Sequence, residues 1–303
     1  MAKHFSIIFT CFTLIGLPGL LFAAEAPQPN SLQSKMESLI AMRAGKATVA
    51  VGFRDLATRE ECAIRADLPL HPASTMKVPV MMEIYRQAAA GRLGLDDRLP
   101  IKNSFASLVD GSPYQLDPKD DSELTLYQRV GGEATLRELV RLMITESSNL
   151  ATNLLIERVS AASTTGLMRS LGAEGIKVLR GVEDNKAYAK GLNNVTTARG
   201  LSRILTLLAE KAVVSEAAST EMLEILKAQK FNEGIPAGLP SGTPVAHKTG
   251  SFRGVYHDAA IVLPSGRKPF ILVVLTQGID DESVAHKLAA EIARAAYAQA
   301  TRP

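Results

Sequence analysis

Ser74 and Lys77 are the residues whose types and spacing most directly suggest chemistry. Residues three positions apart in a helix are neighbours on its surface, so the amine can lie beside the hydroxyl. A serine hydroxyl is a weak nucleophile at neutral pH and needs such a base. The positive end of a helix dipole would also disfavour the protonated amine. Ser74 is therefore the candidate nucleophile and Lys77 its candidate base, although this spacing alone also fits a helix cap with a solvated lysine.

Two other segments carry groups that such a nucleophile needs. In Ser147-Ser148-Asn149, the first hydroxyl can shuttle a proton to a leaving group and the amide can bind substrate. Lys248-Thr249-Gly250 indicates an edge strand with a cation and a hydroxyl for a carboxylate, and a glycine that lets a substrate approach. The backbone N–H groups of Ser74 and Ser251 are candidates for an oxyanion hole. Together these groups predict a serine acyl-enzyme.

The surrounding sequence predicts a sheet that both ends of the chain build. Alternating apolar residues at 47–53 and 62–64 indicate one β-hairpin, and the apolar runs 259–263 and 270–275 indicate another. Helical spacing of apolar residues predicts helices at 31–43, 75–90, 135–144, 151–159, 196–209, 219–227 and 280–298.

We therefore expect an α/β plus all-α fold, in which an antiparallel sheet is flanked by terminal helices and a helical lobe is inserted. Residues 27–72 and 205–303 would form a discontinuous α/β lobe, and 73–204 the all-α lobe. Together they would make one catalytic domain with a ligand cleft between the lobes.

Residues 1–26 have the pattern of a secretory signal: a basic start, an apolar stretch and small residues near its end. We expect this segment to be cleaved and the protein to be exported, either to the periplasm or outside the cell. The alternative is an uncleaved membrane anchor. Cys62 is the only cysteine beyond this segment, so no intramolecular disulfide is expected.

The order of the three motifs resembles that of the penicillin-recognising serine enzymes, and their spacing is most similar to class A β-lactamases. Asn153-Leu154-Leu155 and Thr196-Thr197 extend the resemblance, which covers nearly the whole chain after residue 26. It implies the β-lactamase/transpeptidase-like fold and acylation of Ser74 by a β-lactam.

The sequence departs from this family in the loop at 180–197. Members of the family carry a glutamate there that activates the deacylating water, and an asparagine four residues later. Counting back from Thr196-Thr197, these positions hold Val182 and Lys186 in this chain. Val195 likewise occupies the position of the acidic residue that would pair with Arg180.

Glu183 follows the missing glutamate position by one residue, and we expect it to act as the deacylating base. This requires its carboxylate to reach the water to within about 3 Å. Asp184 is the reserve candidate.

Class A enzymes often place an arginine on the strand after the Lys-Thr-Gly motif, where it helps to hold the substrate carboxylate. His257 stands near that position, so we expect it to bind substrate, and Arg253 lies in the preceding turn. The histidines lack metal-ligand spacing and no glycine-rich phosphate loop follows a strand, so we expect no metal and no other cofactor.

The leading interpretation is an exported, monomeric serine β-lactamase that acts on a small β-lactam or a peptidoglycan-like substrate, without a stable membrane partner. The net charge is only +3 and no run of five or more like charges occurs, so nucleic-acid binding is not expected. The alternatives are a D-alanyl-D-alanine peptidase, or a related serine amide or ester hydrolase, and a non-enzymatic β-lactam-binding sensor.

Overall fold

The computed structural model describes Met1 and residues 31–302, so the predicted signal segment at 1–26 lies outside the described residues apart from Met1. The helices are α1 Leu32–Arg43, α2 Lys77–Ala89, α3 Leu136–Thr145, α4 Asn149–Val159, α5 Ala161–Ser170, α6 Asn185–Ala189, α7 Ala198–Ala209, α8 Glu216–Lys227 and α9 Glu282–Ala300. The strands are β1 Thr48–Asp55, β2 Glu61–Ile64, β3 Arg98–Pro100, β4 Phe105–Ala106, β5 Pro113–Tyr114, β6 Glu133–Thr135, β7 Val245–Phe252, β8 Val255–Val262 and β9 Phe270–Gln277. Short 3₁₀ helices are η1 Ala73–Met76, η2 Pro118–Asp120, η3 Tyr127–Arg129 and η4 Ile235–Gly238.

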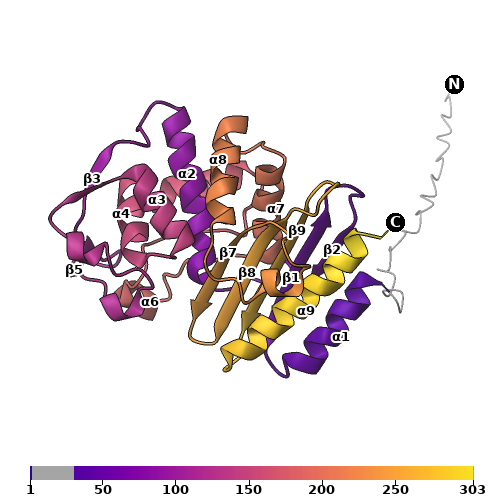
Figure 1. The fold of residues 1–303 in the computed structure, drawn as a ribbon. Helices are drawn as coiled ribbons and strands as arrows, with labels where there is room; N and C mark the ends of the chain where they lie inside the picture. The colour runs from indigo at the N-terminus through magenta and orange to yellow at the C-terminus, as the bar shows by residue number, and fades with distance from the viewer. Residues whose placement is uncertain (2–30, 303) are drawn as a thin grey trace.

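Strands from both ends of the chain form one five-stranded antiparallel sheet in the order β2-β1-β9-β8-β7 (Figure 1). The N-terminal strand β1 pairs with the last strand β9, with Val51 opposite Val274. This pairing leaves β7 as a free edge, and the Lys248-Thr249-Gly250 segment lies on it. The sheet therefore presents that motif to the helical lobe.

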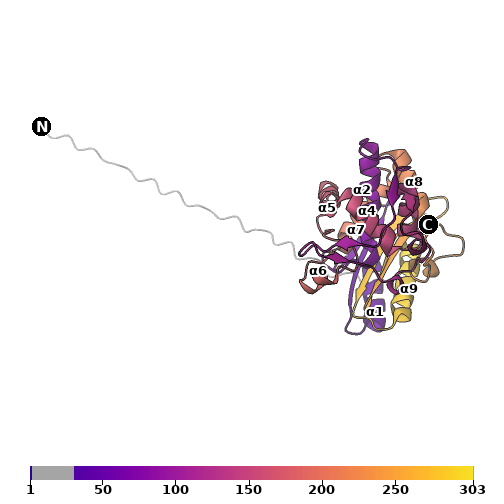
Figure 2. The ribbon, with the colours of Figure 1, turned by 90° about the vertical axis from the view of Figure 1, so that its left-hand side faces the viewer.

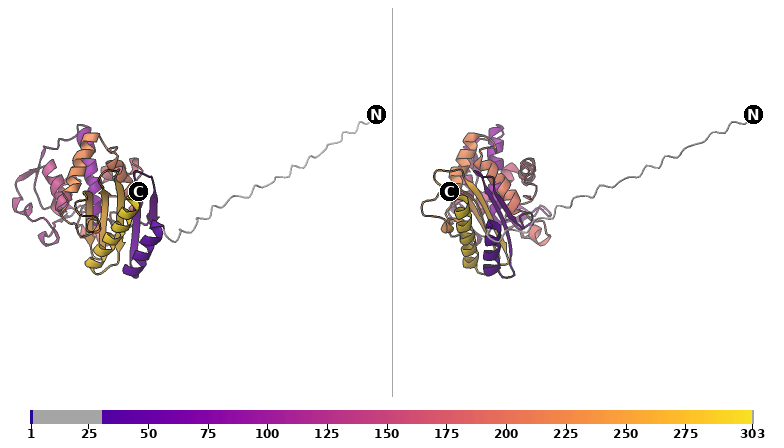
Figure 3. Two further views of the ribbon diagram at one scale, coloured as in Figure 1. Left: turned by 45° about the vertical axis from the view of Figure 1, so that its right-hand side comes forward. Right: turned by 90° about the vertical axis from the view of Figure 1, so that its right-hand side faces the viewer.

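Helices cover both faces of the sheet. On one face α1 and α9 lie side by side, and their buried apolar side chains meet those of the sheet (Figure 3). On the other face α7 crosses β1 and β9 at close range. Gly52 permits this approach, because a Cβ at that position would stand 2.3 Å from Ser202 Oγ and 3.2 Å from the carbonyl oxygen of Ala198.

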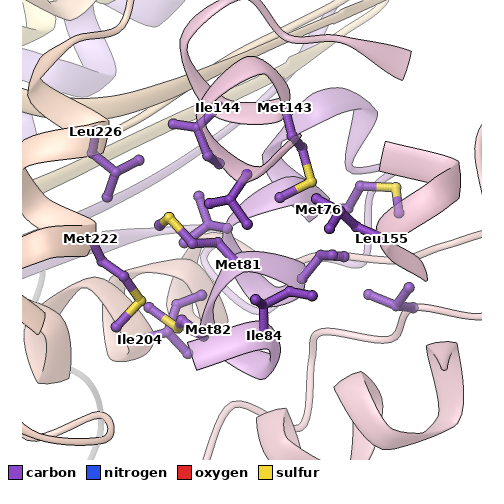
Figure 4. Close-up of a cluster of buried hydrophobic side chains, with 14 of the residues drawn as sticks. Met76, Met81, Met82, Ile84, Met143, Ile144, Leu155, Ile204, Met222 and Leu226 are labelled. Atoms are coloured by element: carbon purple, nitrogen blue, oxygen red, sulfur yellow. The ribbon is translucent and has the colours of Figure 1, made fainter. Parts of the chain in front are cut away.

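The helical lobe lies beside the β7 edge and has a core rich in methionine (Figures 1, 2 and 4). In this core Met81 and Met82 of α2, Met143 of α3 and Met222 of α8 are completely buried. Unbranched methionine side chains fill irregular gaps between helices that cross at different angles. Met76, two residues after the candidate nucleophile, is also buried in this core and anchors the start of α2.

The predicted fold class is confirmed: terminal strands and helices enclose an inserted helical segment. The sequence pattern did not predict α5 or α6, and the expected lobe boundary after residue 204 falls inside α7. No helix within the described residues is both long and apolar enough to cross a bilayer.

Candidate active site

Ser74 lies in the 3₁₀ turn η1, directly before α2, so the helix N-terminus points at it as the sequence suggested. Pro79 is the third residue of α2, where a missing backbone N–H costs nothing. The turn is held by Thr75, whose backbone N–H and hydroxyl both donate to the Pro72 carbonyl at 3.1 and 2.6 Å. Ala73 has a left-handed backbone, with φ at 45°.

Lys77 is completely buried and its amine contacts the 147–149 segment. Its Nζ donates to the Ser147 carbonyl at 2.6 Å, to Ser147 Oγ at 3.2 Å and to Asn149 Oδ1 at 2.9 Å. Burial lowers the pKa of Lys77 to about 7, against the opposing charges of Asp121 and Glu183. The amine is therefore poised to exchange protons near neutral pH and is already joined to the predicted shuttle, Ser147.

Within the described chain, no hydrogen bond joins Lys77 Nζ to Ser74 Oγ. The predicted nucleophile and base are one helical turn apart, but the amine is directed toward Ser147 and Asn149. Catalytic hydrogen bonds are often long before substrate binds, and the lysine side chain has rotatable bonds with which to reorient. A substrate that takes the Asn149 amide would free one of these contacts.

Gly250 brings strand β7 against the nucleophile turn. A Cβ there would stand 3.0 Å from the Ser74 backbone nitrogen and 3.1 Å from the Pro72 carbonyl oxygen. The Lys-Thr-Gly motif therefore needs glycine for close packing as well as for substrate access. Ser251 follows on the same strand and lines the same cavities as Ser74, in keeping with the expected oxyanion hole.

Lys248 is a second completely buried amine, with one hydrogen bond of 3.0 Å to the Thr249 carbonyl. Burial, and then the charge of nearby Lys77, lower the pKa of Lys248 well below its ordinary value. Because the charges of these two buried amines repel each other, the pair favours the binding of an anion. A carboxylate would stabilise the protonated form of either amine.

Two adjoining cavities, of about 520 and 870 Å³, meet at Ser74. The smaller one extends toward the loop at 180–194 and is lined by Glu183. The larger one extends along β7 toward the start of α9. It brings together the predicted residues Ser147, Thr249, Gly250 and His257, while Asn149 and Ser251 line both cavities. The predicted Lys77 and Lys248 are completely buried and line neither cavity.

Glu183 reaches this site although it stands one position from the expected one. Its Oε1 accepts from Asn149 Nδ2 at 3.0 Å and its Oε2 accepts from the backbone N–H of Asp117 at 3.0 Å. Burial raises the pKa of Glu183, while these two hydrogen bonds oppose the shift. A carboxylate with a raised pKa beside the nucleophile is suited to accept a proton from water.

Asn153 fixes the backbone that carries Glu183. Its side chain accepts from the Val182 N–H at 2.7 Å and donates to the Val182 carbonyl at 3.1 Å. Asn153 lies one helical turn after Asn149 in α4, so a single helix holds both the loop backbone and the Glu183 carboxylate. The Val182 side chain packs against the helical core, so it supplies no polar group in the glutamate position.

Neither the reserve base nor the asparagine position supplies an alternative. Asp184 is buried and accepts hydrogen bonds from Ser107 Oγ and the N–H groups of Leu108 and Ala187. Although burial alone would raise the pKa of Asp184, these bonds lower it overall. Lys186 points away to an ion pair with Asp110. Asp184 therefore caps α6 and anchors the loop.

Neutral groups close the loop at 180–194 in place of the missing acid. The Arg180 guanidinium donates to the Leu192 carbonyl at 3.0 Å and to Asn193 Oδ1 at 2.8 Å. Asn194 Oδ1 accepts from the backbone N–H groups of Leu179 and Arg180. The sequence pattern predicted neither Asn193 nor Asn194 in this role, because the family pattern places an acid at the position of Val195.

The expectation that His257 binds substrate does not fit its geometry. Its Nε2 lies 2.8 Å from the His71 carbonyl oxygen, and its Nδ1 accepts from the Thr276 N–H at 3.1 Å. Both ring nitrogens are thus engaged by backbone groups. Arg253 lies over the Phe252 ring and lines the smaller cavity, on the loop side of Ser74.

Asp121 is a buried carboxylate that supports the Ser147-Ser148-Asn149 motif, and no sequence pattern pointed to it. Its Oδ2 accepts from the N–H groups of Asn149 and Leu150 at 2.8 and 3.0 Å, at the positive end of α4. Ser148 caps the same helix through the Ala151 N–H. The serine in the middle of the motif is therefore compatible with an ordered Asn149.

Backbone strain gathers at this site. Among the described residues, eight that are not glycine have positive φ, and four of them line or adjoin the two cavities: Ala73, Ser147, Glu183 and Arg253. Such conformations persist where surrounding contacts hold them, and they concentrate at functional sites. This observation, which no sequence pattern provided, independently marks Glu183.

Comparison with known proteins gives a consistent result over the whole described chain. The sequence model of the β-lactamase enzyme family matches residues 31–300. The chain is 28% identical to β-lactamase Toho-1 of Escherichia coli over 274 residues, 88% of this chain and 89% of that protein.

Solved structures agree with this comparison. A β-lactamase from Sphaerobacter thermophilus superposes with a TM-score of 0.77 at 26% identity, over 89% of this chain and 98% of that one. An ancestral class A β-lactamase superposes with a TM-score of 0.75 at 27% identity, over 89% of this chain and all of that one.

Proposed function

Because this chain belongs to the class A β-lactamase family and is a serine hydrolase of that family, we propose that it hydrolyses the β-lactam amide through an ester on Ser74. The observation that carries this proposal is the convergence of Ser74, Ser147 and Glu183 on one pair of cavities, with the buried Lys77 Nζ 3.2 Å from Ser147 Oγ. These four residues are the proposed catalytic groups.

In the acylation step, neutral Lys77 takes the Ser74 proton as Oγ attacks the lactam carbonyl carbon. The N–H groups of Ser74 and Ser251 stabilise the oxyanion. The carbon–nitrogen bond then breaks, and the leaving nitrogen receives the hydroxyl proton of Ser147. Lys77 then passes to Ser147 the proton that it took from Ser74. Asn149 would bind the substrate amide, and Lys248 with Thr249 its carboxylate, while Gly250 lets the substrate lie along β7.

In the deacylation step, Glu183 takes a proton from a water that attacks the ester carbon. The bond from that carbon to Ser74 Oγ then breaks, and the proton passes from Glu183 to Oγ, which restores both groups. The hydrogen bonds of Glu183 to Asn149 and Asp117 hold its carboxylate beside the nucleophile. The raised pKa of Glu183 supports this role, since it brings the carboxylate closer to the proton affinity that water activation needs.

A Ser74→Ala variant tests this proposal against a chromogenic cephalosporin. We expect wild-type turnover and no turnover above background in the variant. Hydrolysis that survives in a folded Ser74→Ala protein would contradict the proposal.

One observation favours the second candidate, a D-alanyl-D-alanine peptidase or related amide or ester hydrolase: Val182 and Lys186 occupy the positions of the deacylation residues. Turnover of a peptide ending in D-alanyl-D-alanine, together with a long-lived penicilloyl adduct, would select it. A long-lived adduct without any turnover would select a β-lactam-binding sensor.

We further propose that the protein is exported as a monomer, either periplasmic or secreted, and acts on a small β-lactam as a resistance enzyme. The signal-like pattern of residues 1–26 supports export. N-terminal sequencing of the mature protein tests it, with a start near Ala24 to Pro27 expected. Recovery of a full-length, membrane-bound chain would contradict cleavage.

A further inference from the structure

We propose that His257 is a positioning residue for the nucleophile, acting through the backbone of His71. This inference rests on the proposed acylation of Ser74. It replaces the expected contact between His257 and the substrate carboxylate with a contact inside the protein.

The hydrogen bonds of His257 define one neutral tautomer. The Thr276 N–H donates to Nδ1 at 3.1 Å, so Nδ1 carries no proton. Nε2 therefore carries the proton and donates to the His71 carbonyl at 2.8 Å. The ring is buried and burial lowers the pKa of His257 to about 4, so the side chain is neutral at physiological pH. A neutral ring whose nitrogens are both occupied offers little to a carboxylate.

The His71 residue that receives this bond begins the turn that ends at Ser74. While its carbonyl is tied to His257, its ring Nδ1 accepts from the Ala73 N–H at 3.1 Å. Ala73 holds the strained φ of 45° immediately before the nucleophile. A strained residue keeps its conformation only where neighbouring contacts over-determine it. The His257 bond is one of those contacts and links the turn to β8 and β9.

The placement of His257 in the sheet gives the contact a direct path to the reacting atoms. His257 is the cross-strand partner of Gly250, and Gly250 lies against the Ser74 backbone nitrogen. Both ends of the turn thus contact one cross-strand pair of the sheet. The His71 carbonyl accepts from the His257 imidazole, and the Ser74 nitrogen lies against Gly250. Loss of the imidazole would let the turn, with the Ser74 N–H, move relative to the Ser251 N–H on β7.

The His71 ring also joins the turn to the two segments that border the smaller cavity. It stacks on Phe252 of β7 at 4.9 Å between ring centroids and meets the edge of Tyr188 in α6 at 6.3 Å. Of the contacts described here, only the His257 hydrogen bond holds the His71 carbonyl, whereas the Ala73 N–H, Phe252 and Tyr188 all contact the His71 ring.

The experiment compares wild type with His257→Leu and His257→Gln on two substrates: a penicillin with a free carboxylate and the same penicillin as its methyl ester. Quench-flow mass spectrometry measures acylation and deacylation of Ser74 separately, and thermal unfolding measures stability. The ester removes the group that a substrate-binding His257 would contact, so the two roles give different patterns.

We expect acylation by His257→Leu to fall about 10- to 100-fold on both substrates, as for a displaced nucleophile. Deacylation should fall less than acylation, because the ester carbonyl still needs the oxyanion hole but the base, Glu183, belongs to another loop. His257→Gln, which can still donate to the His71 carbonyl, should recover part of the acylation rate. As a measurement on wild type itself, the ¹⁵N shifts of His257 should report the Nε2–H tautomer from pH 5.5 to 8, with and without substrate.

Three results would overturn the inference. A loss confined to the free acid would mean that His257 binds the carboxylate. A proportional loss of both steps, or unchanged acylation in folded His257→Leu, would leave it no positioning role. If both variants fail to fold, the wild-type measurement decides: an imidazolium or the Nδ1–H tautomer at His257 would overturn the inference. Absence of any Ser74 adduct in wild type is distinct, since it would overturn the proposed function first.

Discussion

The Asn149 amide donates a 3.0 Å hydrogen bond to the Glu183 carboxylate, across 34 residues of sequence. The oxygen of the same amide accepts from Lys77 Nζ at 2.9 Å. One side chain thus lies between the proposed base of acylation and the proposed base of deacylation. The shift of the glutamate by one residue still leaves its carboxylate in contact with the motif that we propose binds substrate.

Replacement of Glu183 by glutamine should trap the acyl-enzyme. The amide cannot take a proton from water, so deacylation should fall by about 10²- to 10⁴-fold, while acylation is largely retained. Intact-mass kinetics on a penicillin measure both steps.

Glu233→Gln is the matched control, because Glu233 lines the larger cavity and its side chain makes no hydrogen bond or ion pair within the described residues. It should deacylate at nearly the wild-type rate. Equal turnover by wild type and Glu183→Gln would remove Glu183 from the mechanism.

The acylation rate should increase with pH through a midpoint near 7. Lys77 acts as a base only when neutral, and burial lowers its pKa to about 7, so the active fraction grows as the pH rises through that value. Acylation rates at penicillin concentrations well below saturation, which report the free enzyme, test this between pH 5.5 and 8.5. A midpoint should remain in Glu183→Gln but lie at lower pH, because the charge of Glu183 raises the pKa of Lys77. A rate that is flat across this range, or a midpoint that disappears with Glu183, would assign the base elsewhere.

Gly250→Ala should impair acylation more than its small size suggests. The added methyl would stand 3.0 Å from the Ser74 nitrogen and would push the nucleophile turn away from β7. We expect overpacking to lower the free energy of unfolding by about 1–3 kcal/mol. The acylation rate should fall by at least about 10-fold.

Gly166→Ala in α5 is the control for this change, because no described atom apart from its chain neighbours and its own helix backbone lies within 4 Å of its added Cβ. It should be neutral or slightly stabilising, since alanine favours helix. Wild-type acylation by Gly250→Ala would show that β7 does not position Ser74.

The sequence predicted the elements of the fold well, because long amphipathic helices and apolar strands have clear periodicity. It also predicted that Ser74, Ser147 and Gly250 would meet, and the two cavities bring them together. Ser74 and Ser147 lie just before α2 and α4, where a motif and its local structure specify each other.

The roles that the sequence did not predict depend on which group a side chain contacts in three dimensions. His257 bonds a carbonyl 186 positions away, and Asn193 replaces an acid that the family pattern placed at Val195. Side-chain direction in such contacts depends on the packing of several elements, which a one-dimensional pattern does not encode. The strained φ of Glu183 is likewise visible only in three dimensions.

The intact mass of the mature protein, followed from seconds to hours after addition of a penicillin, tests the central claim most directly. The account predicts an adduct of one drug molecule on Ser74, located by peptide mapping, that forms and then disappears while hydrolysed drug accumulates. If the drug is hydrolysed with no adduct on Ser74 at any time, including in Glu183→Gln, the claim of a Ser74 acyl-enzyme is contradicted.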